Sequence, residues 1–153
     1  MARPPEYELT YDLQLAGPLP STKGSPLGER IYWEMTSARL HGERIEAGIA
    51  MPGGDWMLVG TDGLWRPDVR AQLRSDDGAT ILLHYTGLVK PTAAFLRAAE
   101  EGRETRFEDQ YLRQIMRFDT GSERYAWLTQ DIFIAEGRLA GPARLQYRIY
   151  RLP

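Results

Sequence analysis

The segment 63–87 constrains the fold of this chain more than any other, because it has the pattern of a complete β-hairpin that carries charge. Before its turn, the apolar residues Val69, Ala71 and Leu73 alternate with polar ones, which is the period-two pattern of a half-buried strand. The Asp-Asp-Gly sequence at 76–78 supplies the turn. If such alternation continues around a closed barrel, polar side chains of the hairpin can point into a ligand cavity instead of water.

Short alternating runs recur along the rest of the chain, with Gly, Pro or Asp-Gly between them. Besides the hairpin, strands are predicted at residues 7–15, 30–40, 44–50, 57–59, 110–118, 124–135 and 143–152. Residues 136–142 are predicted to connect the last two strands, and the long polar segment 17–28 is predicted to be a loop. One helix is predicted at residues 93–101, with Thr92 as its N-cap and Gly102 at its end.

This order of elements favours a meandering antiparallel sheet over β-α-β units. The sequence therefore predicts a mainly β protein, a closed antiparallel β-barrel of about eight to ten strands with one short α-helix. A length of 153 residues suits one domain, so residues 1–153 are predicted to form a single β-barrel domain.

Composition excludes several classes of partner. The formal net charge is −2, so no overall basic field draws the chain to nucleic acid or to anionic lipid. The chain has no cysteine, which removes disulfides and thiolate metal sites and fits a reducing cytoplasm. The N-terminus lacks an apolar signal core, and no run approaches the roughly 18 apolar residues of a membrane span. We therefore expect a cytoplasmic protein that binds neither nucleic acid nor membrane.

The turn of the hairpin decides which of its side chains share a face, and it allows two registers. A two-residue turn pairs Ala71 with His84 and leaves His84 among apolar neighbours. A three-residue turn pairs Arg70 with His84 and gathers Asp68 beside them. In this second register the Arg favours the neutral, proton-accepting form of His84, and Asp68 can orient a proton transfer. The alternative is that these charges form a solvated outer face with ordinary cross-strand pairs.

A second group of candidates lies in the segment 111–130. Arg113 and Arg117 share a face of one predicted strand, and Tyr125 and Trp127 share a face of the next, so both faces could line one pocket. Aromatic side chains that hold a planar ligand while an Arg receives developing negative charge are a common way to bind an enolate or phenolate. The alternative is that the two aromatic residues belong to the core, where a tyrosine hydroxyl would need a hydrogen-bond partner.

Other candidates are isolated. Glu34 lies in the apolar run 31–35, where burial would raise its pKa and suit a general acid or base. Trp56 is predicted to cap one end of the barrel, and Asp55 to brace its loop through backbone hydrogen bonds. The chain has only two histidines, which excludes a three-histidine metal site. It also lacks a phosphate-binding loop, a dinucleotide fingerprint and a nucleophile elbow, so neither a metal nor a cofactor is predicted.

Several short motifs in register give the chain a family resemblance. They are Pro-Gly-Gly-Asp-Trp at 52–56, Asp-Gly at 62–63, Asp-Val-Arg at 68–70, Asp-Asp-Gly at 76–78 with Ile81, Arg-Phe-Asp-Thr-Gly at 117–121 and Tyr-Ala-Trp-Leu at 125–128. In order and spacing, over most of the chain from Leu27 onward, they resemble the family called domain of unknown function 3237. The resemblance implies a cavity-bearing β-barrel of about ten strands with one short helix, related in architecture to lipocalin-like and allene-oxide-cyclase-like barrels.

The resemblance also implies a type of chemistry, because some fungal members of this family act as cofactor-free cyclases that add a hydroxyl across an alkene to close an oxygen ring. The motif positions that carry over are Asp55, Trp56, Asp68, Arg70, Tyr125 and Trp127. The register argument adds His84. The segment 32–38 departs from the family pattern, so the resemblance implies that Glu34 is an addition of this chain that bears on its substrate or reaction.

These patterns together predict a cofactor-independent isomerase or lyase of the cyclase type, acting on a small hydrophobic aromatic or polyketide-like molecule in the barrel cavity. The predicted catalytic residues are Arg70, Asp68, His84 and Tyr125. The predicted substrate-binding residues are Glu34, Trp56, Arg117 and Trp127. The alternatives are a non-catalytic carrier or sensor for the same kind of ligand, and a barrel with a filled lumen that serves as an interaction domain. A homodimer is compatible with each of them.

Overall fold

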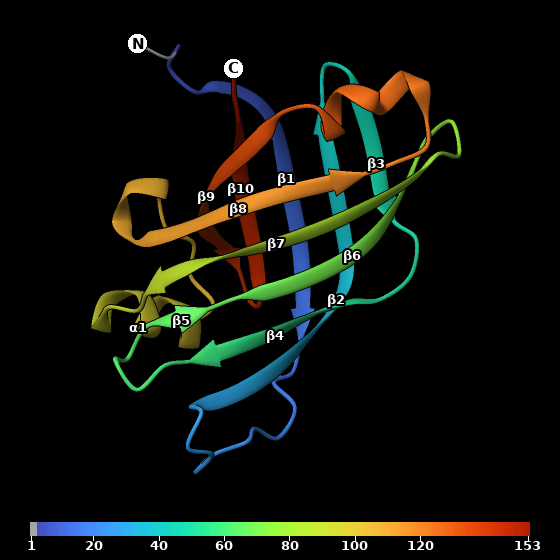
Figure 1. Ribbon diagram of the computed structural model, residues 1–153. Coiled ribbons are helices and arrows are strands. Elements are labelled where there is room, and N and C mark those ends of the chain that lie inside the picture. Colours follow the sequence, from blue (N-terminus) through green and yellow to red (C-terminus); the bar gives the residue numbers. More distant parts are fainter. Residues whose placement is uncertain (1–2) are drawn as a thin grey trace.

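The computed structural model describes residues 3–153, which form ten strands, one α-helix and two short 3₁₀ helices (Figure 1). The strands are β1 (Glu6–Ala16), β2 (Glu29–Gly42), β3 (Ile45–Ile49), β4 (Gly53–Val59), β5 (Trp65–Arg66), β6 (Asp68–Ser75), β7 (Thr80–Lys90), β8 (Tyr111–Asp119), β9 (Ile132–Gly141) and β10 (Arg144–Leu152). The helices are α1 (Ala93–Glu100), η1 (Phe107–Asp109) and η2 (Glu123–Thr129).

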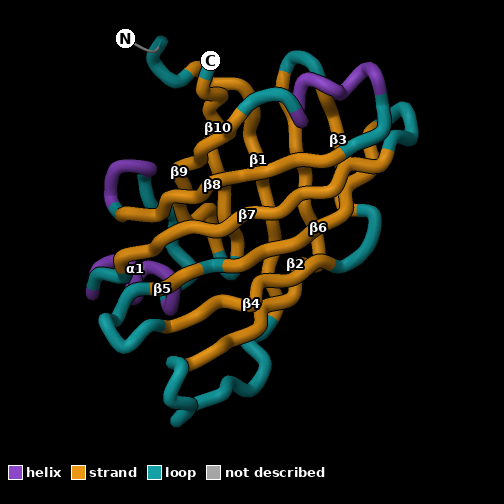
Figure 2. Tube along the Cα trace, in the orientation of Figure 1, coloured by secondary structure: helices purple, strands orange, loops and turns teal. Residues whose placement is uncertain are grey.

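The ten strands form one antiparallel sheet that closes on itself. From β6 through β7, β8, β9 and β10 to β1, each strand bonds to the next. β1 also pairs with β2, and β2 returns to β6 through β3 and β4. The strands in Figure 2 accordingly wrap around a common interior. The predicted closed antiparallel barrel is confirmed.

Alternate side chains of each strand point into the barrel and form its core. In β1, Leu9, Tyr11 and Leu13 are buried, as their alternation predicts. Tyr7 has the same parity in the sequence but is 57% exposed. The reason is a β-bulge between Tyr7 and Leu9, which exchanges the inner and outer sides of the strand at that point.

The hairpin of β6 and β7 takes the register of the three-residue turn. Arg70 lies opposite His84, and Asp68 lies opposite Thr86. Gly78 has a φ of 88°, a left-handed conformation that glycine adopts without steric cost.

Helix α1 covers one end of the barrel and η2 lies at the opposite end (Figure 1). The predicted cap of α1 is confirmed, because the Thr92 side chain accepts a hydrogen bond from the Phe95 N–H at 3.1 Å. None of the helices in residues 3–153 is long and apolar enough to cross a membrane.

The strand predicted at 124–135 was wrong in its first half, because residues 123–129 form η2. Tyr125 and Leu128 are both buried, and their three-residue spacing suits a 3₁₀ turn rather than a strand. The predicted connection at 136–142 was also wrong. β9 continues to Gly141, and only Pro142 and Ala143 separate it from β10.

We expect Gly87→Ala to destabilise the barrel by about 1–3 kcal/mol, the usual cost of overpacking a core. Gly87 lies in β7 opposite Gln114, and a Cβ there would collide with the Arg113 carbonyl oxygen and the Gln114 side chain. Gly121→Ala is the matched control, since a Cβ there would meet no atom within 4 Å. Urea denaturation compares the two variants, and equal free energies of unfolding would contradict this packing.

Candidate functional site

A layer of three tyrosines crosses the barrel interior. Tyr11, Tyr85 and Tyr147 come from β1, β7 and β10, and all three are buried. Their ring centroids lie 5.9 to 6.4 Å apart, within the range of favourable aromatic pairs. The Tyr11 hydroxyl donates to the sulfur of Met35 at 3.0 Å. This layer fills the barrel around its middle.

An interior cavity of about 330 Å³ adjoins this layer at the end covered by α1. Tyr147 forms part of its wall, together with Phe95 and Ala99 of α1. The remaining lining residues are Leu15, Gly17, Trp33, Asp55, Met57, Trp65, Pro67, Val89, Leu112, Leu139, Gly141, Ala143, Arg144 and Leu145. The wall is therefore mainly apolar and aromatic, with few polar groups.

Asp55 is the carboxyl group of this cavity. It lies in β4 opposite Trp33 of β2 and Val69 of β6, so its parity turns it toward the lumen. Its Oδ1 accepts the backbone N–H of Asp68 at 3.0 Å. Within residues 3–153 it forms no ion pair with a cationic side chain.

The surroundings of Asp55 raise its pKa from 3.8 to about 6. Burial is the main cause, since it penalises the charged carboxylate. The hydrogen bond from the Asp68 N–H acts in the opposite direction. A carboxyl group with a pKa near 6 can both accept and donate a proton near neutral pH.

The interior tyrosines, unlike Asp55, keep their protons near neutral pH. Burial raises the pKa of Tyr147 above its ordinary value, and the nearby charge of Asp55 raises it further. The pKa values of Tyr85 and Tyr11 are also raised, mainly by burial. These hydroxyls therefore stay protonated. The Tyr147 hydroxyl accepts a hydrogen bond from Gln114 Nε2 at 3.5 Å, and its own proton can be donated from the cavity wall.

The aromatic residues of the cavity can hold a planar ligand. Trp33 and Trp65 are half-buried on its wall, and the Trp65 ring meets Phe95 edge-on with centroids 6.0 Å apart. Rings fixed in this way offer faces and edges on which a bound ring can pack. The cavity thus combines one carboxyl group, one neutral hydroxyl, the Arg144 side chain and aromatic walls.

Four of the residues predicted as site residues lie on the outer face of the barrel. Arg70, His84 and Arg117 form a row across β6, β7 and β8, and His84 Nε2 lies 3.1 Å from Asp68 Oδ1. Their strand neighbours such as Val69 point inward and are buried. Because successive side chains alternate, the charged ones face solvent. The structure brings these four together, but outside the lumen.

The other four predicted residues are not gathered with them. Glu34 lies on the outer face of β2 opposite Gly54. Trp56 is 46% exposed and packs on Tyr32, with ring centroids 4.9 Å apart. These two residues therefore line no part of the interior cavity.

Tyr125 and Trp127 belong to η2, at the end of the barrel opposite α1 (Figure 1). Tyr125 is buried, and its hydroxyl donates to Asp77 in the β6–β7 turn at 3.2 Å. The guanidinium of Arg44 lies 3.7 Å from the Trp127 ring centroid. Both aromatic residues close that end of the barrel. They therefore have a structural role, which was the alternative to a ligand site for them.

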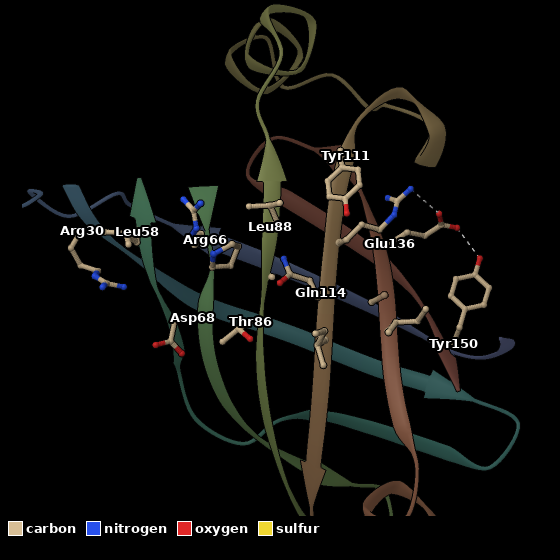
Figure 3. Close-up of a pocket in the computed structure, with 16 residues that line it drawn as sticks. Arg30, Leu58, Arg66, Asp68, Thr86, Leu88, Tyr111, Gln114, Glu136 and Tyr150 are labelled. Carbon is tan, nitrogen blue, oxygen red and sulfur yellow. Dashed lines mark hydrogen bonds and ion pairs between the residues drawn. The ribbon is translucent and has the colours of Figure 1, made fainter. Parts of the chain in front are cut away.

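A groove of about 780 Å³ lies on the outer face of the barrel (Figure 3). Its charged side chains have partners, some of them outside the groove. Arg113 lies 3.6 Å from Glu136, which also accepts the Tyr150 hydroxyl at 2.7 Å, and Arg66 lies 2.6 Å from Asp62. Because these side chains already have partners, whereas Asp55 forms no ion pair within residues 3–153, the interior cavity is the stronger candidate for chemistry.

Within residues 3–153, no three His, Asp or Glu side chains gather in a way that could hold a metal ion. The cavity offers a single carboxyl group, that of Asp55, among its lining residues.

Sequence reasoning missed the inward position of Asp55 and did not single out Tyr147. β4 begins at Gly53 rather than at Met57, so Asp55 is a strand residue two positions from buried Met57 and faces the same side. Tyr147 lies between Leu145 and Ile149 in an alternating run. Extending the alternation of each strand to its ends would have found both residues.

The family described as "Protein of unknown function (DUF3237)" matches residues 5–152 of this chain. A UPF0311 protein of Clostridium acetobutylicum is 28% identical over 131 residues, which cover 84% of this chain and 82% of that protein. A UPF0311 protein of Rhodopseudomonas palustris is 25% identical over 107 residues, or 70% of each chain.

Solved structures share the fold. A conserved protein of unknown function from Rhodopseudomonas palustris matches with a TM-score of 0.86 and 21% identity over 97% of this chain and 96% of that one. A β-barrel-like protein from Acinetobacter baumannii matches with a TM-score of 0.80 and 26% identity over 98% and 96%. A structure described as an enzyme from Penicillium herquei matches with a TM-score of 0.68 and 20% identity over 99% and 97%.

The raised pKa of Asp55 predicts a specific pH dependence of stability. Between pH 3.8 and about 6 the folded protein holds a proton that the unfolded chain has released. The proton bound to Asp55 stabilises the folded protein. This stabilisation is fully present below pH 3.8, the pKa of Asp55 in the unfolded chain, and is lost as the pH rises through about 6. The free energy of unfolding of the wild-type protein should fall by about 3 kcal/mol over this range, and we expect Asp55→Asn to abolish this fall. Urea unfolding of the wild-type and Asp55→Asn proteins at a series of pH values tests this. The same change of unfolding free energy with pH in both proteins would contradict it.

Proposed function

The chain belongs to the DUF3237 family of proteins of unknown function, and we propose that it is a cofactor-independent isomerase or lyase of the cyclase type. Its proposed substrate is a small hydrophobic, aromatic or polyketide-like molecule bound inside the barrel. The observation that carries the proposal is the position of Asp55 on the wall of an aromatic cavity, where its carboxyl group has a pKa of about 6 and forms no ion pair within residues 3–153.

The size of the cavity limits the substrate. Ligand pockets for small molecules commonly measure about 300–1,000 Å³, and the interior cavity of about 330 Å³ lies at the lower end of that range. Trp33, Trp65 and Phe95 are placed to pack on a ring. A compact molecule with one or two rings fits both the volume and the wall.

The proposed reaction adds a substrate hydroxyl across a carbon–carbon double bond. Asp55, as a carboxylate, accepts the proton of a phenolic or enolic hydroxyl, and the oxygen bonds to one alkene carbon as the π bond breaks. Asp55 then returns the proton to the other alkene carbon. No electrons are gained or lost overall, so the reaction requires no oxidant, reductant or cofactor.

Tyr147 has a supporting part in this reaction. Its hydroxyl stays protonated because burial raises its pKa, and it lies on the cavity wall. A hydroxyl donor fixed before the reaction can stabilise negative charge that develops on the substrate oxygen. Apolar walls strengthen this interaction because they exclude water.

Comparison with solved structures supports the proposal at the level of the fold. The structural neighbour from Penicillium herquei is described as an enzyme, so a barrel of this architecture can support catalysis. At 20% identity the comparison assigns no residue and no substrate to this chain, and the assignment of Asp55 and Tyr147 rests on the geometry of the cavity.

A non-catalytic carrier or sensor for the same kind of molecule is the second candidate. The observation that favours it is the predominance of apolar side chains on the cavity wall. A carrier needs the volume and the rings but no proton-transfer group. The two functions therefore differ in whether the Asp55 carboxyl changes a bound ligand.

We expect the protein to convert phenols that carry an unsaturated side chain, and Asp55→Asn to lower kcat by at least about 100-fold while ligand affinity is kept. Asn retains the shape of Asp and can still accept the Asp68 N–H, so the fold is preserved. Proton NMR in deuterated water follows both ring closure and deuterium transfer to carbon.

Asp76→Asn is the control, because Asp76 is an exposed carboxyl of the β6–β7 turn. It should leave kcat unchanged. Saturable binding by the wild-type chain without turnover of any compound would support the carrier instead. Equal kcat values for Asp55→Asn and wild type would remove Asp55 from the mechanism.

A further inference from the structure

Three basic or titratable side chains lie side by side on the outer face of the barrel. Arg70 of β6 lies directly opposite His84 of β7, which lies directly opposite Arg117 of β8. Neighbouring strands are about 4.8 Å apart, so this row spans about 10 Å. Both arginines are exposed, and His84 is partly exposed.

The two arginines of this row have no ion-pair partner in the part of the chain that the structure describes. Within residues 3–153, nine other arginines form ion pairs with Asp or Glu. Among these described residues, Arg70 and Arg117 form none, and neither donates a side-chain hydrogen bond. Like charges at neighbouring positions of a sheet repel one another. The row therefore carries uncompensated positive charge on a chain whose net charge is −2.

His84 is already fixed in place between them. Its Nε2 lies 3.1 Å from Oδ1 of Asp68, which orients the ring on the sheet surface. Asp119 lies two residues from Arg117 on the same strand face but forms no ion pair with it within the described residues. The acidic groups thus flank the row rather than neutralise its arginines.

The row borders a surface hollow of about 440 Å³ that also has apolar parts. Leu82 is 45% exposed and Met51 is 58% exposed, and both line the hollow. Pro52 lies between Met51 and β4 and lines it as well. A charged group held by the row would therefore place an attached apolar group on this surface.

We propose that Arg70, His84 and Arg117 form a surface site for an oxyanion, the phosphate or carboxylate group of a molecule whose apolar part lies on Leu82. Guanidinium groups bind both kinds of oxyanion through paired, charge-assisted hydrogen bonds. Bound anion would also relieve the repulsion between the two arginines.

This site is separate from the interior cavity. Arg70 and Arg117 lie on the outer side of strands whose inner side carries buried residues such as Ala71 and Phe118. None of the three residues of the row lines the interior cavity. Oxyanion binding by the row therefore does not depend on the function proposed for Asp55.

The test is a titration of the whole chain with inorganic phosphate, phenyl phosphate and benzoate, at fixed pH and with chloride holding the ionic strength constant. The readout is the NMR signals of the two histidine rings. His41 is an internal control, because it forms a similar pair with Asp12 at 3.0 Å but lies outside the row. We expect saturable shifts of the His84 signals only, and tighter binding of phenyl phosphate than of inorganic phosphate.

Substitutions identify the groups that bind. Arg70→Gln and Arg117→Gln should each weaken phenyl phosphate binding about tenfold, the usual effect of losing one charge-assisted hydrogen-bonding group. Arg74→Gln is the matched control, since Arg74 is another exposed arginine of β6 without an ion pair among the described residues. It should leave binding unchanged.

Three results would overturn the site: equal, non-saturating shifts of both histidines, unchanged binding after both arginine substitutions, or an equal loss with Arg74→Gln. Saturable shifts with the two phosphates but not with benzoate identify a phosphate ligand, and saturable shifts with benzoate as well identify a general oxyanion site. Both of these outcomes support the proposal.

Discussion

Closure of the sheet into a barrel decides where each side chain of this molecule can act. Because β1 bonds to both β10 and β2, every strand has one side toward the lumen and one toward solvent, and successive residues alternate between them. Parity alone therefore places Asp55 inside and the neighbouring Trp56 outside. The bulge after Tyr7 shows how sensitive this assignment is, since one shifted position moves an aromatic side chain from the core to the surface.

Features that depend on local chemistry could be predicted from the sequence. The hairpin register follows from a turn that ends in left-handed Gly78, and the start of α1 follows from Thr92. The residues near the hairpin do not determine which of its faces lines the lumen. That depends on the apolar faces of the strands that close around the hairpin. Val69 and its alternating partners belong to the shared core, so Arg70 and Asp68 must face outward.

The residues whose positions the sequence did not predict are placed by the ends of strands and by packing between distant segments. Asp55 follows two glycines that look like a turn in the sequence but are the first residues of β4. Gly54 is required there because a Cβ would overlap the ring of Tyr32. Tyr125 and Trp127 alternate as strand residues do, yet η2 forms because Tyr125 reaches Asp77 of the β6–β7 turn and Trp127 lies beneath Arg44. Contacts between remote residues decide both cases, and no short window of sequence contains them.

In the proposed reaction, burial of Asp55 connects substrate binding with proton transfer. In the free protein its pKa of about 6 leaves the carboxyl mostly ionised at neutral pH. A hydrophobic ligand that fills the cavity displaces water and raises the pKa of this carboxyl further. The bound carboxylate is then a stronger base than the free one, which favours removal of a proton from the substrate hydroxyl. Because Asp55 forms no ion pair within residues 3–153, binding energy from the apolar part of a ligand can be used to drive the first step of the proposed reaction.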